Sequence, residues 1–569
     1  MRTWFQPQAR LLCLVLLATF AGGVNAAERV DLIVRNGVIY DGSGRDPVRG
    51  DVAVKAGRVV ATGKLQDYTA DKEVNANGLA VAPGFINTLS WSVESLIYDG
   101  RGMSEIKQGV TTEIFGEGNS MGPVNDRVRE EMIKTQGDIH YDVTWKTLGE
   151  YLDFLVKKGV SPNVASFVGA TTVRENVVGF DDVAPSPEQL KQMQELVRQA
   201  MREGALGVGS SLIYAPASYA KTDELIALCK AASEFGGGYI SHMRSEGDRF
   251  LEALDELIHI SREAKVHAQA YHLKAAGQKN WPKMQQAIDK IDAARKQGLP
   301  ITADMYAYTA GATGLDAAMP TWVQQGGIDG WVAQLKKPDV RKKVLAEMRD
   351  PNAKWESLLL AAGSPDRVLL IGFKTDKLKP LTGKTLAQVA KMRGVSPEDA
   401  AIDLVIEDHT RVGTAYFLMS EENVQLGLSQ PWVNIGSDAE AAAPEGPFLL
   451  SNPHPRAYGT FARFLGRYVR DQKVTTLQDA IRRLTRLPAE SFKLKDRGCL
   501  DKGCFADIVV FDPAKINDLA TFEKPHQYAV GVKDVFVNGT QVLRDGEHTN
   551  AKPGQVVHGP GWVGWKKKT

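Results

Sequence analysis

Short runs in which hydrophobic and polar residues alternate occur near both ends of the chain. The runs are Asp31–Gly37 and Asp51–Val60 near the N-terminus, and Ala506–Asp512 and Val532–Gly539 near the C-terminus. Such alternation between turn residues is typical of half-buried β-strands. The pattern therefore predicts one small β-sandwich domain that both termini build together, from residues 27–80 plus 485–569, around a separate middle domain.

The middle of the chain contains apolar segments that are mostly followed by helical patterns. These segments are Val81–Asn87, Gly109–Phe115, Val164–Gly169, Ala205–Ser210, Gly238–Met243, Val266–Leu273, Ile301–Tyr306 and Trp432–Ser437. This is the number of strands in a TIM (β/α)8 barrel. We therefore expect an α/β fold with a barrel over residues 81–484. Its long stretch at about 310–432 is interpreted as an insertion on the catalytic face, either a lid or a packing element.

The charge balance limits the partners of this chain. Its 569 residues include 69 Lys and Arg against 68 Asp and Glu. No overall charge is available to attract nucleic acid or an anionic membrane. We therefore expect a small-molecule partner and no nucleic acid.

Residues 1–26 are typical of a secretory signal peptide. Arg2 and Arg10 precede an apolar run from Leu11 to Phe20, and small residues lead to the expected cleavage point after Ala26. An uncleaved anchor is the less favoured alternative, because the run is shorter than the roughly 20 residues of a spanning helix. The pattern predicts a periplasmic or secreted protein with no membrane attachment after cleavage.

Three cysteines remain after that cleavage. Cys229 lies in a helical pattern of apolar residues and is expected to be buried. Cys499 and Cys504 flank a turn, and an oxidising compartment would allow them to form a disulfide. The sequence favours neither the paired nor the reduced state of these two residues.

Polar residues end several of the predicted strands, which is where the catalytic groups of a TIM barrel lie. His242 and His272 end neighbouring strands, and Asp438 ends the last one. A single histidine at such a place is more often a core or capping group. Two on neighbouring strands together with a carboxylate favour a metal site, and these donors suit zinc or a similar divalent ion.

Segments spread in order over nearly the whole chain match those of a known family. They are Asp31–Gly37, Val81–Asn87, Ser241–Arg244, His272–Gly277, Thr302–Tyr306, Gly436–Asp438, His454–Gly459 and Ala506–Pro513. Together they resemble the amidohydrolase superfamily and, more narrowly, its N-acyl-D-amino-acid deacylase (D-aminoacylase) branch. Any one segment is weak evidence, but their order and spacing are specific.

The resemblance implies an amide-cleaving metallohydrolase. It implies that His242 and His272 bind the catalytic metal, and that Asp438 is the general acid/base that moves a proton from water to the leaving nitrogen. Lys274 and Tyr306 match positions near the substrate carboxylate or the scissile carbonyl. 

Arg456 is a further candidate for binding the substrate carboxylate. Its planar guanidinium can hold both carboxylate oxygens. A surface or interdomain ion pair is an equally good interpretation of this residue.

Two positions depart from the family pattern. The first strand of the superfamily normally ends in His-x-His, where this chain has Leu89 and Trp91, neither of which can ligate a metal. The branch also has a cysteine ligand after its second strand, where this chain has Gly118. We expect Glu117, in a flexible Gly-Glu-Gly loop, to replace that cysteine. Glu113 is the alternative, since strand alternation places it on the same side.

These departures predict one Zn²⁺ per chain, although manganese, nickel or cobalt also suit such donors. The leading hypothesis is a deacylase of N-acyl amino acids, for which the resemblance alone implies the D configuration. A hydrolase of dipeptides or cyclic amides is the alternative, because a fold fixes the chemistry better than the substrate. A third hypothesis is a binding protein of the same fold that has lost its activity.

Overall fold

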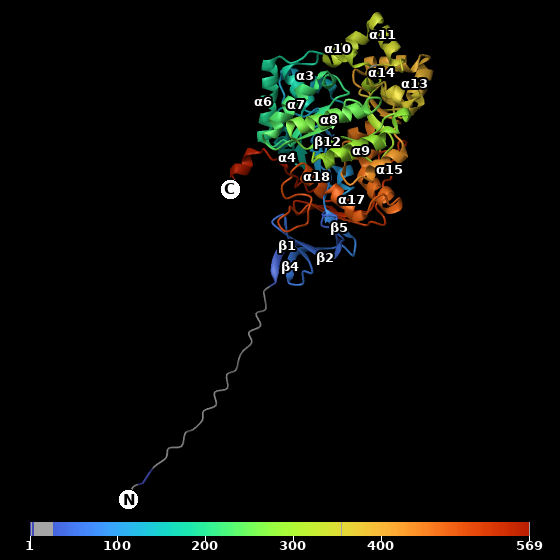
Figure 1. Ribbon diagram of the computed structural model, residues 1–569. Helices are drawn as coiled ribbons and strands as arrows, with labels where there is room; N and C mark the ends of the chain where they lie inside the picture. Colours follow the sequence, from blue (N-terminus) through green and yellow to red (C-terminus); the bar gives the residue numbers. More distant parts are fainter. Residues whose placement is uncertain (2, 5–26, 354, 568–569) are drawn as a thin grey trace.

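A barrel of parallel strands and a sheet made from both ends of the chain form the protein (Figure 1). The computed structural model describes residues 1, 3–4, 27–353 and 355–567. The predicted signal peptide lies almost wholly outside the described residues. Within the described part, no helix combines the length and the hydropathy that crossing a membrane requires.

The barrel strands are each hydrogen-bonded in parallel to the next. They are β6 (Phe85–Asn87), β7 (Val110–Phe115), β8 (Asn163–Ser166) continued by β9 (Val168–Gly169), β10 (Gly207–Ser211), β11 (Gly238–His242), β12 (Ala268–Ala270), β13 (Ile301–Met305) and β17 (Val433–Ile435). The last strand returns to the first, because the N–H of Thr88 donates to the carbonyl of Ile435 at 3.4 Å. The predicted TIM barrel is therefore confirmed.

Amphipathic helices cover the outside of this barrel. They include α4 (Leu148–Lys158), α5 (Ala170–Val177), α6 (Pro187–Glu203), α7 (Thr222–Ser233), α8 (Phe250–Ala264), α9 (Lys283–Lys296) and α17 (Leu477–Leu484). Helix α6 begins where the hydroxyl of Ser186 accepts the N–H of Gln189, and it ends at the left-handed Gly204. Its buried Val197 and Met201 lie four residues apart on one face. Burial of each such side chain contributes about 1.5–3 kcal/mol.

The sheet outside the barrel joins strands from opposite ends of the sequence. From the N-terminal part come β1 (Glu28–Ile39), β2 (Val48–Lys55), β3 (Arg58–Gly63), β4 (Tyr68–Asn75) and β5 (Ala80–Pro83); from the C-terminal part come β18 (Ile508–Phe511), β19 (Val532–Val537), β20 (Thr540–Arg544) and β21 (Glu547–His548). Strand β5 pairs with β1 on one side and with β18 on the other. The β-domain is therefore built by both termini, as the alternating patterns predicted.

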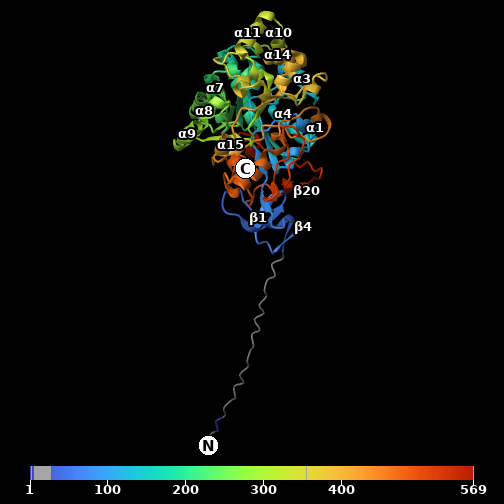
Figure 2. The ribbon, with the colours of Figure 1, turned by 90° about the vertical axis from the view of Figure 1, so that its right-hand side faces the viewer.

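A long insertion between β13 and β17 covers the end of the barrel that faces away from the terminal sheet. It contains α10 (Gly327–Leu335), α11 (Pro338–Met348), α12 (Leu358–Ala362), α13 (Leu386–Arg393), α14 (Pro397–Asp408), α15 (Glu421–Leu428) and the small sheet of β14 (Gly311–Gly314), β16 (Gly413–Tyr416) and β15 (Val368–Gly372). Helices α10, α11 and α14 lie opposite β1 and β4 in both views (Figures 1 and 2).

The cysteines have distinct environments. Cys499 and Cys504 form a disulfide, which settles the pairing that the sequence left open. Cys229 is free and buried in α7, as expected.

Candidate active site

A cavity of about 790 Å³ opens at the C-terminal ends of the barrel strands. Loops after β7, β11, β12, β13 and β17 line it from below, and residues of the insertion line it from above. This is the end of a TIM barrel at which active sites form. The polar residues singled out in the sequence lie around this cavity.

Glu117, His242 and His272 converge on one point of the cavity floor. The Oε1 atom of Glu117 lies 3.0 Å from Nδ1 of His242 and 3.1 Å from Nε2 of His272. Each of the three residues is at most 4% exposed. Their donor atoms all lie within 4.8 Å of one another, so they can share a single ion.

The backbone is bent where it delivers these side chains. Gly116 and Gly118, on either side of Glu117, have φ of 107° and 76°, which glycine adopts without steric cost. A Cβ at Gly116 would lie 2.4 Å from the carbonyl oxygen of Phe167. His272 has a φ of 33°, a strained value for a residue with a side chain. The local fold therefore brings these side chains together with a strained backbone at His272.

The donor chemistry of the cluster fits a divalent cation. Burial lowers the pKa of His242, which favours the neutral ring that metals need. Burial alone would raise the pKa of Glu117, but its bonds with His242 and His272 outweigh that effect and hold the pKa below its usual range. A buried carboxylate beside two imidazoles is a known ligand set for zinc in hydrolases.

Glu246 is the residue that the sequence analysis missed. Its Oε1 atom lies 2.9 Å from Nδ1 of His272 and accepts a 2.6 Å hydrogen bond from Nζ of Lys274. Glu246 therefore orients His272 in the way that outer carboxylates orient metal-binding histidines. Its position four residues after His242 was the available signal, but a loop rather than a strand carries it.

The insertion fixes the loop that carries Glu246. The half-buried carboxylate of Glu356 accepts the backbone N–H groups of Glu246 and Gly247 at 3.0 and 3.2 Å. The insertion is thus connected directly to the surroundings of the cluster.

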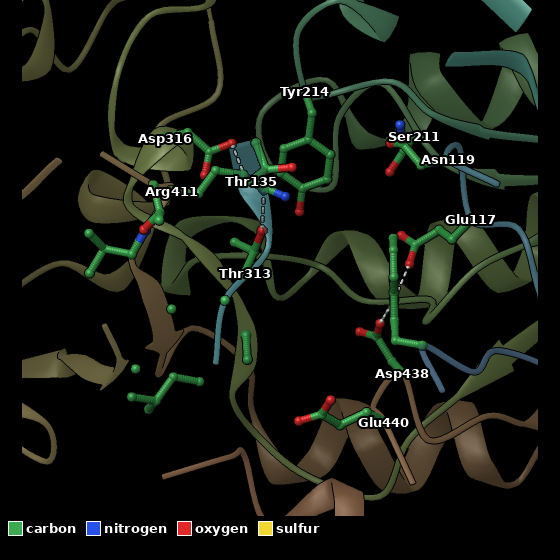
Figure 3. A pocket seen from close by; sticks show the side chains of 18 of the residues that line it. Glu117, Asn119, Thr135, Ser211, Tyr214, Thr313, Asp316, Arg411, Asp438 and Glu440 are labelled. Atoms are coloured by element: carbon green, nitrogen blue, oxygen red, sulfur yellow. Dashed lines mark hydrogen bonds and ion pairs between the residues drawn. The ribbon is translucent and has the colours of Figure 1, made fainter. Parts of the chain in front are cut away.

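Asp438 lies beside the cluster between two donors. Its Oδ1 atom accepts the indole N–H of Trp91 at 3.1 Å, and its Oδ2 atom lies 2.8 Å from Nη1 of Arg456. Burial raises the pKa of Asp438, and Arg456 opposes that rise only in part. Figure 3 shows the carboxylates of Asp438 and Glu117 facing one another across the site.

Three further predicted site residues also line the cavity. Lys274 is ion-paired with Glu246, and the guanidinium of Arg456 lies 4.6 Å from the ring centre of Tyr306. The interpretation of Arg456 as a surface ion pair is wrong, because the residue is 4% exposed and pairs with Asp438. Among the described residues, the hydroxyl of Tyr306 hydrogen-bonds only to the sulfur of Met419, a weak acceptor, at 3.8 Å.

Glu113 lies away from the convergence point. It is wholly buried within β7, where Oε2 accepts a 3.0 Å hydrogen bond from Asn87. Burial raises the pKa of Glu113 to about 7, so it is poorly suited to a charged ligand role. Only Glu117 of the two candidate carboxylates faces both histidines.

One side of the cavity carries a second arginine, which is already neutralised. Nε of Arg411 lies 2.8 Å from Oδ2 of Asp316. The guanidinium of Arg411 also lies over the ring of Tyr214, which in turn contacts the ring of His242. Figure 3 shows Arg411 and Asp316 on the opposite side of the pocket from Glu117 and Asp438, and Glu440 near Asp438.

The comparisons with known proteins agree with this geometry. The model of the amidohydrolase family matches residues 72–543. The chain belongs to the amidohydrolase family. Within it, a D-aminoacylase of Alcaligenes xylosoxydans xylosoxydans is 33% identical over 93% of this chain and 98% of its own length. The resemblance to the D-aminoacylase branch is therefore confirmed.

Two solved structures are similar to this amidohydrolase over most of its length. The N-acyl-D-glutamate deacylase of Bordetella bronchiseptica, in complex with zinc and a phosphonate inhibitor, is 28% identical with a TM-score of 0.78. A D-aminoacylase with a binuclear metal centre, described as activated by one metal and attenuated by a second, is 29% identical with a TM-score of 0.77. Each match covers 93% of this chain and 100% of the other.

The cluster predicts the effect of ligand substitutions on metal content. Glu117→Gln and His242→Asn should each weaken zinc binding more than about 100-fold, since even residues that only orient ligands are worth about 10- to 100-fold. Zinc retained after dialysis is measured by elemental analysis. His259→Asn, an exposed histidine of α8, is the control and should keep its zinc. Full zinc content in both ligand variants would contradict this assignment.

Proposed function

We propose that this amidohydrolase is a deacylase with one zinc ion per chain, which cleaves the amide bond of N-acyl-D-amino acids. The observation that carries the proposal is the convergence of Glu117, His242 and His272 beside Asp438 on the floor of a cavity. The names of the similar proteins supply the substrate class, since they are deacylases of N-acyl-D-amino acids.

Asp438 is the group that moves the proton. When bound, the zinc ion would activate a water molecule and polarise the scissile carbonyl. Asp438 takes a proton on its carboxylate and delivers it to the leaving nitrogen, so that the amine departs neutral. Arg456 and Trp91 orient this carboxylate through its two oxygens. Because burial raises the pKa of Asp438, activity should fall as the pH drops through that raised value.

Tyr306 and Arg456 are the groups available to hold the substrate. Within the described part of the chain, the Tyr306 hydroxyl has only a weak sulfur acceptor, so it can donate to the substrate carboxylate or to the carbonyl. Arg456 keeps other N–H groups besides the one that meets Asp438. Lys274 also lines the cavity, where Glu246 accepts a hydrogen bond from its ammonium and so fixes its position.

Dipeptides and cyclic amides are the second candidate substrates. The cavity of about 790 Å³ lies in the upper half of the usual range for ligand sites, about 300–1,000 Å³, and so has room for a larger amide. The same residues would perform that reaction.

A substrate screen tests the proposed function. We expect the zinc-loaded protein to hydrolyse N-acetyl-D-amino acids faster than their L-enantiomers, dipeptides or cyclic amides, measured by amine release. Asp438→Asn should lower kcat about 10²- to 10⁴-fold and keep its zinc. Glu440→Gln, a cavity carboxylate outside the cluster, is the control. Hydrolysis of L-compounds or dipeptides alone would contradict the substrate class, and full turnover by Asp438→Asn would contradict the mechanism.

The ion pair between Arg411 and Asp316 predicts which amino-acid side chains of the substrate the enzyme prefers. Asp316 neutralises this guanidinium, so acidic side chains gain little from it. Asp316→Asn should raise kcat/KM for N-acetyl-D-glutamate relative to N-acetyl-D-leucine about tenfold, which is the effect of one hydrogen bond to a charged group. The control is Asp399→Asn, which breaks a similar pair with Arg341 in the insertion. An unchanged ratio would show that Arg411 does not face the side chain.

We also propose that the protein acts in the periplasm or outside the cell. The signal-peptide pattern of residues 1–26 supports this, as does the disulfide between Cys499 and Cys504. The full chain, expressed in a bacterium with two membranes, should yield a mature periplasmic protein that begins at Ala27. Mass spectrometry of each fraction checks this, and a cytoplasmic protein with an intact leader would contradict it.

A further inference from the structure

One side chain lies between the two carboxylates on which the proposed chemistry depends. The indole Nε1 atom of Trp91 is 2.9 Å from Oε2 of Glu117 and 3.1 Å from Oδ1 of Asp438. A single N–H is therefore shared by two acidic side chains. The two oxygens of Glu117 have different partners, because Oε1 faces the histidines and Oε2 faces Trp91.

The surroundings of that N–H provide no metal ligands from the first barrel strand. An indole nitrogen is a donor only and has no lone pair to offer an ion. Leu89, two residues earlier, is 1% exposed and packs in an apolar cluster with Ile86 and Ile114. Trp91 therefore occupies the space between Glu117 and Asp438 with a group that cannot ligate an ion, and Leu89 offers no ligand atom either.

Two ionised carboxylates that face one another repel unless a hydrogen-bond donor or a cation lies between them. Here the neutral N–H of Trp91 donates to both carboxylates, and the cationic Arg456 pairs with the other oxygen of Asp438. A second cation between these carboxylates would have to displace the indole, which lines the cavity and is 36% exposed. The pair of hydrogen bonds therefore fixes both carboxylates without an ion.

We infer that Trp91 is a positioning residue that takes the place of a second metal ion, orienting Asp438 and Glu117 through one N–H and keeping the centre mononuclear even in excess zinc. The inference rests on the proposed zinc-dependent function and adds a reason for its single ion. It also predicts a contrast with the D-aminoacylase described above, since an excess of metal should not attenuate this enzyme.

The first test is metal stoichiometry, which needs no substrate. The wild-type protein, dialysed against increasing Zn²⁺, should bind one ion per chain and stay at one. The variant that carries both Leu89→His and Trp91→His restores imidazoles at the two positions and should bind two. Loading with Co²⁺ gives a second readout, because the visible absorption spectrum of a chain with two bound cobalt ions differs from that of a chain with one. Two ions in the wild-type centre would overturn the inference.

The second test separates positioning from packing. Trp91→Phe keeps an aromatic ring and removes only the N–H, so kcat should fall about tenfold while KM changes less than about twofold. Trp322→Phe, which removes an indole N–H bonded to Glu347 in the insertion, is the matched control and should leave both constants unchanged. An unchanged kcat in Trp91→Phe would overturn the positioning role.

The two tests distinguish this inference from the proposed function. If no N-acyl-D-amino acid is hydrolysed but the wild type binds one ion and the double variant two, the substrate class fails and the role of Trp91 as a barrier to a second metal stands. If Trp91→Phe does not fold, the double variant and the wild type still decide the stoichiometry.

Discussion

One carboxylate oxygen shared by two imidazoles is the interaction on which the arrangement of the site depends. Oε1 of Glu117 meets His242 and His272 at 3.0 and 3.1 Å. That meeting requires the parallel register of the barrel, because His242 ends β11 and His272 follows β12. The neighbouring residues are arranged around this point. Glu246 orients His272 from one side, and Trp91 holds Glu117 from the other.

The pairing of charges around that point explains how so many ionised groups lie in a buried site. Lys274 lies against Glu246, and Arg456 against Asp438. A buried charge is costly unless it is paired. Burial opposes the ionised form of Glu246, but Lys274 and the two histidines outweigh that effect and lower its pKa, whereas Arg456 offsets the raised pKa of Asp438 only in part. The three converging donors of the cluster therefore remain for a cation, while Trp91 satisfies the free oxygen of Glu117.

Strand patterns predicted the barrel, because apolar runs recur at the strands, and the polar residues that end them predicted His242, His272 and Asp438. Strand alternation alone could not separate Glu113 from Glu117. The bend at Gly116 separates them, since it turns Glu117 toward the histidines and leaves Glu113 inside the strand. Glu246 was missed because its loop has no periodic pattern, and its place depends on Glu356 in the distant insertion.

The contact between β5 and β18 has a consequence for how the molecule is assembled. In the sequence, β5 precedes all the barrel strands and β18 follows them, yet the two are direct neighbours in the terminal sheet. The sheet can close only after the ribosome has made almost the entire chain, and pairing of such distant segments is slow. The terminal sheet is therefore expected to close last, after the barrel segments that separate its strands in the sequence.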